Sequence, residues 1–233
     1  MKAKFQIKET VVTIISEKEF IEVAKEAIIA HRRELESFIA QDPFFALTLE
    51  PYPNRQNVPG IVKRMIDAGS KVGIGPMSAV AGTISQLAVE EMRDAGATHA
   101  IVDNGGDIAL INDRPVLIGV YAGKINDFAL KIEPQKLILG ICTSSGKIGP
   151  SISFGNADSV TVISQNTSLA DSAATAIGNI VTDKNSINCA IDNYKQIDGV
   201  DGVLIICEDH IATWGRLPEI VRAKVSYDLI TRP

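Results

Sequence analysis

Ser159–Val181 reads SVTVISQNTSLADSAATAIGNIV and holds the sharpest change of pattern in the 233-residue chain. Its first part, Ser159 to Ile163, is apolar and β-branched, which predicts a buried strand, and a polar turn from Ser164 to Ser168 follows. The residues that then recur at helical spacing are Leu169, Ala173, Ile177 and Ile180. This stretch therefore predicts a strand that passes through a short turn into a helix with one apolar face.

Asp171 and Thr175 lie four residues apart inside this predicted helix, so their oxygen atoms project from one face. Two hard oxygen ligands on one face suit a Mg²⁺ ion that keeps its other positions for water and substrate phosphates. The segment from Ser168 to Asp171 also fits a capping box, in which Asp171 only stabilises the start of its own helix. Thr175 would then bond back to the Asp171 carbonyl. Taken alone, the spacing favours the cap.

The composition is that of a globular protein rich in small aliphatic residues, with 45% hydrophobic residues, 22% charged residues and a mean hydropathy of +0.14. A net charge of −5 without a basic block argues against a nucleic-acid partner. The N-terminus lacks a signal peptide's apolar centre, and no apolar run reaches the roughly 18 residues that span a bilayer. We expect a cytoplasmic protein without membrane contact, and the hydropathy leaves room for a homodimer interface.

The N-terminal part predicts a strand pair and a long helix. Residues 3–15 alternate between apolar and polar side chains, and Glu17 to Ala40 has apolar residues at helical spacing. Ser16 and Glu19 fit a capping box at the start of that helix.

Prolines and asparagines between Gln41 and Gly60 break the helical pattern and mark the best internal boundary. We expect a single domain over residues 1–233, in which residues 1–57 pack against a motif-bearing part, residues 58–233. Three cysteines in apolar stretches predict reduced, mostly buried thiols, and they are Cys142, Cys189 and Cys207.

The segment from Gly73 to Gly82 reads GIGPMSAVAG and opens a helix that we expect to stop at Gly96. Its glycines, its proline and Ser78 suit a helix N-terminus where unpaired N–H groups attract phosphate. The alternative is a tightly packed entry, in which Gly82 lets the helix lie close to a sheet. The segment matches neither G-x-G-x-x-G nor a Walker loop, so both interpretations stay open.

A run of short strands with turn-rich connections predicts an antiparallel meander. The predicted strands are His99 to Val102, Ile108 to Ile111, Val116 to Tyr121, Phe128 to Ile132 and Leu137 to Cys142. Asn104-Gly105 is a strong hairpin signal between the first two, although the doubled glycine and two flanking acids, Asp103 and Asp107, exceed what a hairpin needs. We expect an α+β fold with a mostly antiparallel sheet flanked by helices.

The hydroxyl-rich loop from Thr143 to Lys147 offers either a polar pocket, in which Lys147 meets an anion, or a flexible connection. Cys142 just before it has apolar neighbours and no nearby histidine, which indicates an inert core thiol. The remaining prediction is a short helix from Ile187 to Tyr194, a strand from Gly202 to Cys207 and a closing helix from Pro218.

Taken in order, these motifs resemble the ApbE family of flavin transferases, and in particular an uncharacterised branch of ApbE-like proteins. The matching segments are Ala79 to Gly82, Asn104 to Asp107, Thr143 to Gly146, Ser159 to Val162 and Ala170 to Ala176. The resemblance implies an ApbE-like fold, Mg²⁺ bound by Asp171 and Thr175, and a pocket for the small-molecule nucleotide FAD. The residues it assigns to that pocket are Ser78, Gly82, Asn104, Gly105, Gly106, Asp107, Thr143, Ser144 and Ser145.

The family reaction moves FMN from FAD onto a protein threonine and releases AMP, and some members hydrolyse FAD instead. This chain departs from the family at the His-x-x-Asp-Pro motif, which Pro150 to Asn156 replaces, and at the lysine before Gly82, which is Ala81. The hydroxyl-rich loop is one residue longer, so either Thr143 or Ser144 takes the place of the family threonine.

The resemblance makes Asp171 a candidate catalytic residue. Asp107 and Asp158 are candidate substitutes for the missing acid or base. Because the family's histidine and lysine are absent, the alternative is a protein of the same fold that binds a phosphorylated ligand without catalysis.

Overall fold

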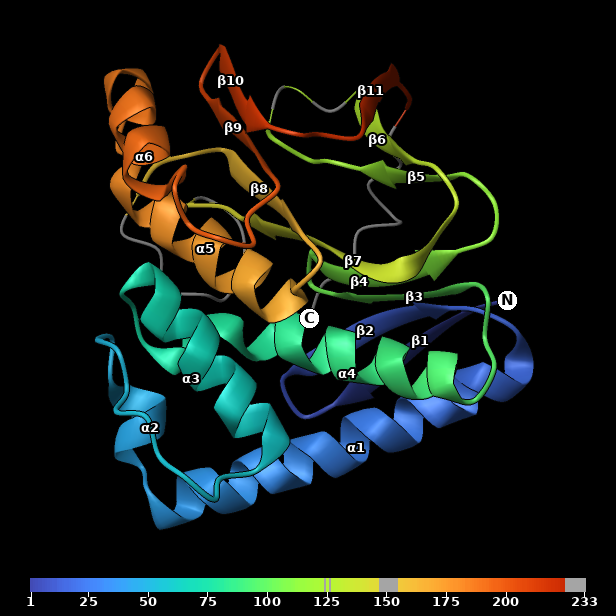
Figure 1. Cartoon of the computed structure of the whole chain (residues 1–233). Helices are drawn as coiled ribbons and strands as arrows, with labels where there is room; N and C mark the ends of the chain where they lie inside the picture. The colour runs from blue at the N-terminus through green and yellow to red at the C-terminus, as the bar shows by residue number, and fades with distance from the viewer. Residues whose placement is uncertain (124, 126, 147–154, 225–233) are drawn as a thin grey trace.

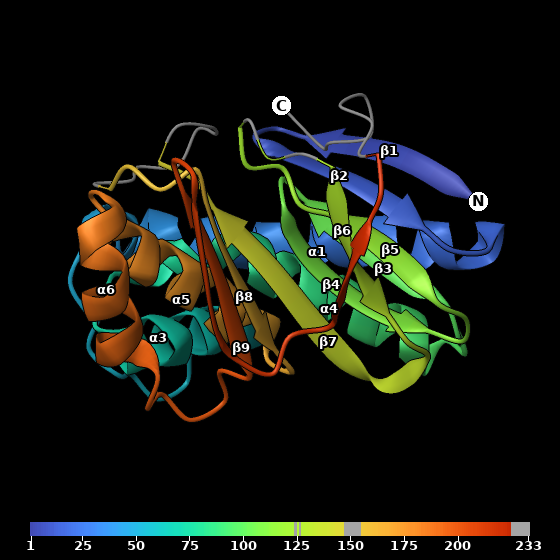
Figure 2. The ribbon, with the colours of Figure 1, turned by 90° about the horizontal axis from the view of Figure 1, so that it is seen from above.

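The computed structural model describes residues 1–123, 125, 127–146 and 155–224 and arranges them in three layers (Figure 1). Helices cover one face of an eight-stranded sheet, and a three-stranded sheet lies over part of the other face (Figure 2). All the strand pairs are antiparallel in the described residues. The predicted α+β fold, a mostly antiparallel sheet flanked by helices, is confirmed.

The large sheet has the strand order β1-β2-β3-β4-β7-β8-β9-β10. Its strands are β1 (Lys2–Ile7), β2 (Thr10–Ile15), β3 (Ala100–Asn104), β4 (Asp107–Asn112), β7 (Gln135–Ser144), β8 (Ser159–Ser164), β9 (Gly202–Cys207) and β10 (His210–Gly215). The N-terminal strand pair predicted from residues 3–15 is confirmed. It joins the rest of the sheet because β2 pairs with β3, with Thr13 opposite Asp103.

The small sheet has the order β11-β6-β5. Its strands are β5 (Val116–Gly119), β6 (Phe128–Ile132) and β11 (Glu219–Arg222). The closing helix predicted from Pro218 is therefore wrong. Residues after Pro218 form a strand because β6 supplies a hydrogen-bonding partner, with Glu219 opposite Lys131, and the short segment Glu219–Arg222 carries two β-branched residues.

The helical elements are α1 (Lys18–Gln41), α2 (Phe44–Leu47), α3 (Gly60–Val72), η1 (Pro76–Ala79), α4 (Val80–Asp94), α5 (Thr167–Ile180), η2 (Lys184–Ser186) and α6 (Ile187–Tyr194). Within the described ranges, no helix by itself combines the length and the apolar composition needed to cross a membrane. Helix α3 together with the η1–α4 segment meets both requirements, but a bend of 108° separates the two parts.

One local prediction fails at the start of α1. Ser16 does not cap α1, because Glu17 is the N-cap residue and the Ser16 hydroxyl donates instead to the His99 carbonyl oxygen at 2.6 Å. This contact joins residues 83 positions apart, so the local pattern does not contain it. Cys142 and Cys207 are buried and Cys189 is exposed on α6, so the thiols are mostly buried, as predicted.

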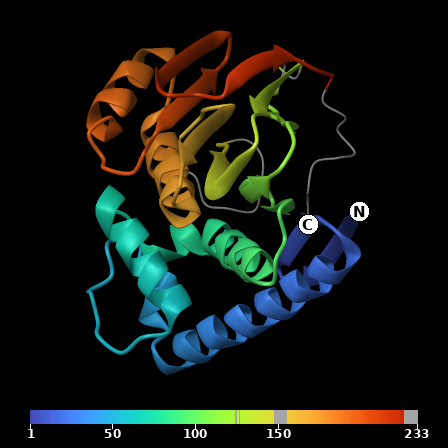
Figure 3. The same ribbon diagram turned by 45° about the vertical axis from the view of Figure 1, so that its right-hand side comes forward.

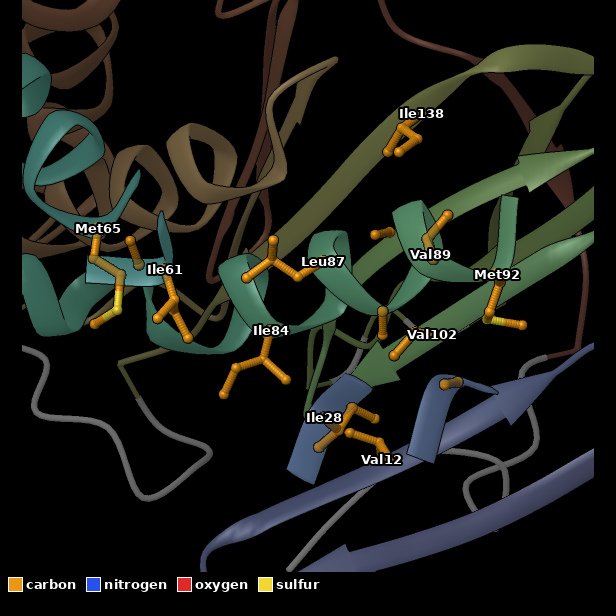
Figure 4. Packing of buried hydrophobic residues seen from close by; sticks show 14 of the residues in the cluster. Val12, Ile28, Ile61, Met65, Ile84, Leu87, Val89, Met92, Val102 and Ile138 are labelled. Carbon is orange, nitrogen blue, oxygen red and sulfur yellow. The ribbon is translucent and has the colours of Figure 1, made fainter. Parts of the chain in front are cut away.

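The alternation of side chains along the strands separates the two faces of the large sheet. On the helix face, Ile84 and Leu87 of α4 pack with Ile28 of α1 and with Val102 and Ile138 of the sheet (Figure 4).

Further along the same face, Cys142 of β7 and Val162 of β8 pack with α5. The next residues along each strand, Ile141 and Ile163, pack on the opposite face with the small sheet. Any side chain of β7 can therefore be assigned to the α5 face or to the small-sheet face.

Candidate functional site

Asp171 of α5 caps the N-terminus of the neighbouring helix α4. Its Oδ2 accepts the N–H of Gly82 at 2.7 Å, and the N–H of Ala81 also favours its charged form. These N–H groups belong to the first turn of α4 and have no acceptor within that helix. A carboxylate at this position also interacts favourably with the dipole of α4. Asp171 is thus a cap, although for a different helix from its own.

The predicted capping box within α5 is wrong. The N-cap residue of α5 is Asn166, whose side chain accepts the N–H of Leu169 at 3.1 Å. Ser168 lies inside the helix and its hydroxyl accepts a hydrogen bond from the Thr83 hydroxyl at 2.8 Å. The reason is that the first N–H groups of α5 find acceptors on Asn166 and on α4.

The first turns of α4 and α5 pack against each other (Figure 3) and run in opposite directions, because Gly82 contacts Asp171 whereas Gln86 contacts Thr167. The residues that join them are polar, and we call this contact the polar seam: Ser78, Gly82, Thr83 and Gln86 on the η1–α4 side, and Thr167, Ser168, Asp171 and Ser172 on α5. A Cβ atom at Gly82 would lie 2.6 Å from the Thr167 carbonyl oxygen and 2.7 Å from the Asp171 Cβ. The close-packing interpretation of Gly82 is therefore confirmed, with α5 rather than a sheet as the neighbour.

The turn between β3 and β4 is the two-residue hairpin that Asn104-Gly105 predicted. Gly105 and Gly106 have φ angles of 70° and 104°, which only glycine adopts without strain at both positions. The Asp103 carboxylate accepts the Gly106 N–H at 2.9 Å and fixes the turn. The turn interpretation is confirmed, and Asp103, one of the two flanking acids, stabilises it.

The hairpin is tied to the start of α4 by two side chains. The Asn104 amide donates to the Ala81 carbonyl at 3.3 Å, and the Ser85 hydroxyl donates to the Asp107 carbonyl at 2.8 Å. These contacts bring Asp107, at the start of β4, into the electrostatic field of Asp171. Residues predicted from separate motifs thus meet where α4, α5, β4 and β7 join.

Asp107, which is half-buried, and Asp171, which is buried, are a pair of neighbouring carboxyl groups. Burial raises the pKa of Asp107 well above its usual range, and the charges of Asp171 and Asp103 raise it further, while hydrogen bonds from Cys142 and Thr143 oppose the rise. Burial also raises the pKa of Asp171 to about 7, although two backbone N–H groups favour its charged form. The pair lacks a basic side chain among the described groups that perturb these pKa values most.

Cys142 lies beside this pair. Its thiol donates to the Thr167 carbonyl at 3.5 Å and also interacts with the Asp107 carboxylate. Burial and the charges of Asp107 and Asp171 raise the pKa of the thiol well above its usual range. The prediction of an unreactive buried thiol agrees with this environment, but the thiol is part of the site lining.

Thr175 lies one turn after Asp171 on α5 and is half-buried. Its hydroxyl makes no hydrogen bond to another described residue, so the predicted bond to the Asp171 carbonyl is absent. In the described ranges no three His, Cys, Asp or Glu side chains gather as a metal site would require. A metal bound by Asp171 would therefore also need hydroxyl, carbonyl or water oxygens, the set that Mg²⁺ accepts.

At the end of β7, the side chains of Thr143 and Ser144 lie on opposite faces of the sheet. Ser144 lies on the α5 face, where its Oγ is 3.5 Å from the position of a Cβ on Gly178. The Thr143 hydroxyl shares a hydrogen bond of 2.9 Å with Thr161 on the opposite face. Ser144 is therefore the hydroxyl residue of β7 on the same face as Asp171.

Several residues predicted for the site lie away from Asp107 and Asp171 or outside the described residues. Ser145 is half-buried beyond the end of β7, whereas Lys147 and most of the segment from Pro150 to Asn156 are outside the described residues. The Asp158 carboxylate accepts the Glu208 N–H at 2.6 Å at the turn between β9 and β10. Two surface cavities of about 450 and 420 Å³ are not lined by Asp107 or Asp171.

Sequence reasoning did not identify Ser85, Gln86 or Ser172 as part of the seam or its attachments. A signal for Ser172 was present, because Ser168, Asp171, Ser172 and Thr175 form a polar stripe on a helix that is otherwise apolar. A polar stripe on a helix buried on nearly all sides indicates polar contacts with its neighbours.

A family model described as AbpE bacteria matches residues 2–209. A UPF0280 protein of Methanosarcina barkeri is 54% identical over 236 residues, covering 100% of this chain and 93% of that protein. The apo form of the flavinyl transferase ApbE of Pseudomonas stutzeri superposes with a TM-score of 0.62 at 13% identity, covering 94% of both chains. The ApbE protein of Thermotoga maritima gives 0.56 at 15% identity, covering 100% and 99%. The chain therefore belongs to the UPF0280 family, an ApbE-like branch described by the AbpE bacteria model, and has the fold of the ApbE proteins.

Proposed function

We propose that this protein binds FAD together with Mg²⁺ where α4, α5, β4 and β7 meet, and that it cleaves the pyrophosphate bond, passing FMN to a hydroxyl group or to water and releasing AMP. The observation that carries the proposal is the pair of neighbouring carboxyl groups Asp107 and Asp171, because no basic side chain of the described residues is among the main causes of their pKa shifts. Two carboxylates held together in a poorly hydrated place require a cation when both are charged.

Asp171 and Thr175 are the residues that would hold Mg²⁺, because both present hard oxygen atoms from adjacent turns of α5. When bound, Mg²⁺ would offset the negative charge that develops on the leaving phosphate. The cap that Asp171 forms on α4 supports this role, because the hydrogen bond of 2.7 Å from the Gly82 N–H keeps one Asp171 oxygen in place. The fold shared with flavin transferases supports a flavin nucleotide as the ligand.

The other residues of the site have roles that follow from their positions. No atom of the described residues lies within 4 Å of a Cβ atom built on Gly105, so a ligand can approach the backbone of the hairpin turn closely. Asp107, with its raised pKa, can hold a proton near neutral pH and exchange it with the attacking hydroxyl or the leaving phosphate. Ser144 offers a hydroxyl from the facing strand.

The test is isothermal titration of FAD into the protein with and without Mg²⁺, using Asp171→Asn and the matched variant Asp94→Asn. Asp94 is exposed at the end of α4, so its substitution makes the same chemical change away from the site. We expect Mg²⁺-dependent FAD binding that Asp171→Asn weakens at least tenfold and Asp94→Asn leaves unchanged. Equal binding by the two variants, or no effect of Mg²⁺, would contradict the proposal.

A second candidate function is binding of FAD without turnover. It is favoured by Ala81, which stands where the ApbE flavin transferases have a lysine. Ala81 supplies only backbone contacts to the site. Chromatographic detection of AMP after incubation with FAD and Mg²⁺ separates the two candidates. AMP release that Asp107→Asn reduces supports catalysis, whereas binding without AMP supports the second candidate.

A further inference from the structure

Gln86 occupies the N-terminus of α5 from the neighbouring helix. Its Oε1 accepts the N–H groups of Thr167 at 2.8 Å and Ser168 at 3.4 Å. These are the first two residues of α5, and such groups have no acceptor within their own helix. Both residues are buried, so water does not replace the glutamine.

The orientation of the Gln86 amide is set by a second contact. Its Nε2 donates to Glu90 Oε1 at 3.0 Å, and Glu90 makes a two-point ion pair with Arg64 of α3 at 2.7 and 2.8 Å. Because a carboxylate only accepts hydrogen bonds, the amide nitrogen must face Glu90 and the amide oxygen must face α5. The relay from Arg64 through Glu90 to Gln86 therefore links three helices.

This relay lies one helical turn from the candidate site. Gln86 follows Gly82 by four residues on α4, and Thr167 precedes Asp171 by four residues on α5. The contact of Gln86 with Thr167 and the contact of Gly82 with Asp171 are consequently neighbouring hydrogen bonds of the polar seam. The position of α5 along α4, and with it the position of the Asp171 carboxylate, depends on both hydrogen bonds.

We propose that Gln86 is a positioning residue for the site: it holds α5 at the height that places the Asp171 carboxylate on the N-terminus of α4. It also closes the N-terminus of α5 to ligand phosphate, because Gln86 and Asn166 together occupy the N–H groups of its first three residues. The first statement rests on the proposed function only where ligand affinity is concerned. The placement of Asp171 can be measured without any ligand.

The test compares Gln86→Met, which keeps the length of the side chain but cannot accept a hydrogen bond, with Gln165→Met at an exposed position before α5. The ligand-free readout is the Gly82 amide resonance and its hydrogen exchange, which report the bond to Asp171. The ligand readout is the dissociation constant for FAD with Mg²⁺. We expect Gln86→Met to shift the Gly82 resonance, accelerate its exchange at least tenfold and weaken FAD binding at least tenfold.

The double variant Gln86→Glu with Glu90→Gln tests the relay directly. A carboxylate at position 86 still accepts the α5 N–H groups, and an amide at position 90 donates to it, so the contact is rebuilt with its donor reversed. We expect this variant to restore the Gly82 resonance and to bring FAD affinity within threefold of the original protein. Gln86→Glu alone places two carboxylates together and should not restore either readout.

An unchanged Gly82 resonance with FAD affinity within twofold in Gln86→Met would overturn the proposal, even if thermal stability fell. If Gln86→Met does not fold, Gln86→Asn, which keeps the amide on a shorter side chain, is expected to give the same shifts and is judged in the same way. If the original protein fails to bind FAD with Mg²⁺, the proposed function fails, and the Gly82 amide alone decides whether Gln86 positions Asp171.

Discussion

Replacing Gly82 by alanine tests how closely α4 and α5 must approach. The new Cβ would lie 2.6 Å from the Thr167 carbonyl oxygen and 2.7 Å from the Asp171 Cβ, whereas ordinary contact begins at 3.4 Å. The helices must therefore separate by roughly 0.8 Å, which lengthens the bond from the Gly82 N–H to Asp171 beyond hydrogen-bonding range. Overpacking costs about 1–3 kcal/mol and loss of a charged hydrogen bond about 1.5–3 kcal/mol. Better helix propensity offsets about 1 kcal/mol of this.

The expected net loss is about 2–4 kcal/mol, or a fall in the melting temperature of about 5–15 °C for a chain of this size. The matched control is Gly60→Ala at the first residue of α3, where no atom of the described part of the chain lies within 4 Å of the new Cβ. We therefore expect a change between zero and a gain of about 1 kcal/mol. Urea unfolding of both variants measures the difference. A loss below about 0.5 kcal/mol in Gly82→Ala would refute the close approach of the helices.

Three further predictions follow from the structure. Burial raises the pKa of Asp171 from 3.8 to about 7. Between these two pH values the folded state binds more protons than the unfolded state, so the free energy of unfolding falls as the pH rises. Asp171→Asn should reduce this fall by on the order of a few kcal/mol in urea titrations from pH 4 to 8. Gly106→Ala should cost about 1–2 kcal/mol because φ is 104°, while Gly105→Asn, at 70° with open space around it, should cost less in the same assay. A thiol reagent should label Cys189 alone in the folded protein and all three cysteines in urea, and rapid labelling of Cys142 would contradict its burial.

Elements with a clear local pattern of apolar residues or glycines could be predicted from the sequence. The helix at Ile187–Tyr194 and the strand at Gly202–Cys207 have the predicted bounds, and the hairpin at Gly105 and Gly106 forms as predicted. In each case the deciding information lies within about ten residues. The glycine pair, the helical spacing of apolar residues in Ile187–Tyr194 and the uninterrupted apolar run of Gly202–Cys207 are sufficient because no distant partner changes the outcome.

Elements whose state depends on distant partners were not predictable in the same way. The strand β11 exists because it pairs with β6, and no feature of Glu219–Arg222 reveals that partner. Ser168 was expected to cap α5, but its hydroxyl accepts from Thr83, 85 residues earlier in the chain. Capping patterns in the sequence describe only residues close to the helix end. They therefore do not predict the cap of a buried helix whose N–H groups bond to another helix.

The sequence named two carboxyl groups that the structure brings together, but it did not show how they are brought together. The motifs named Asp107 and Asp171 separately, yet their enclosure beside each other, which raises both pKa values, follows from the tertiary structure. The two interpretations of Asp171, cap and metal ligand, were treated as alternatives within one helix. The structure shows a cap on a different helix, which leaves the metal role compatible with it.

The cap that Asp171 places on α4 has a consequence for how the chain acquires its structure. The two partners are 89 residues apart, and the chain between them also carries β3, β4, β7 and β8. Contacts of such long sequence separation form late, because the loop between them must be closed first. During synthesis the first turn of α4 therefore has no cap until α5 has left the ribosome. A fragment that ends before Thr167 contains all of α4 but lacks the Asp171 carboxylate that accepts the Gly82 N–H.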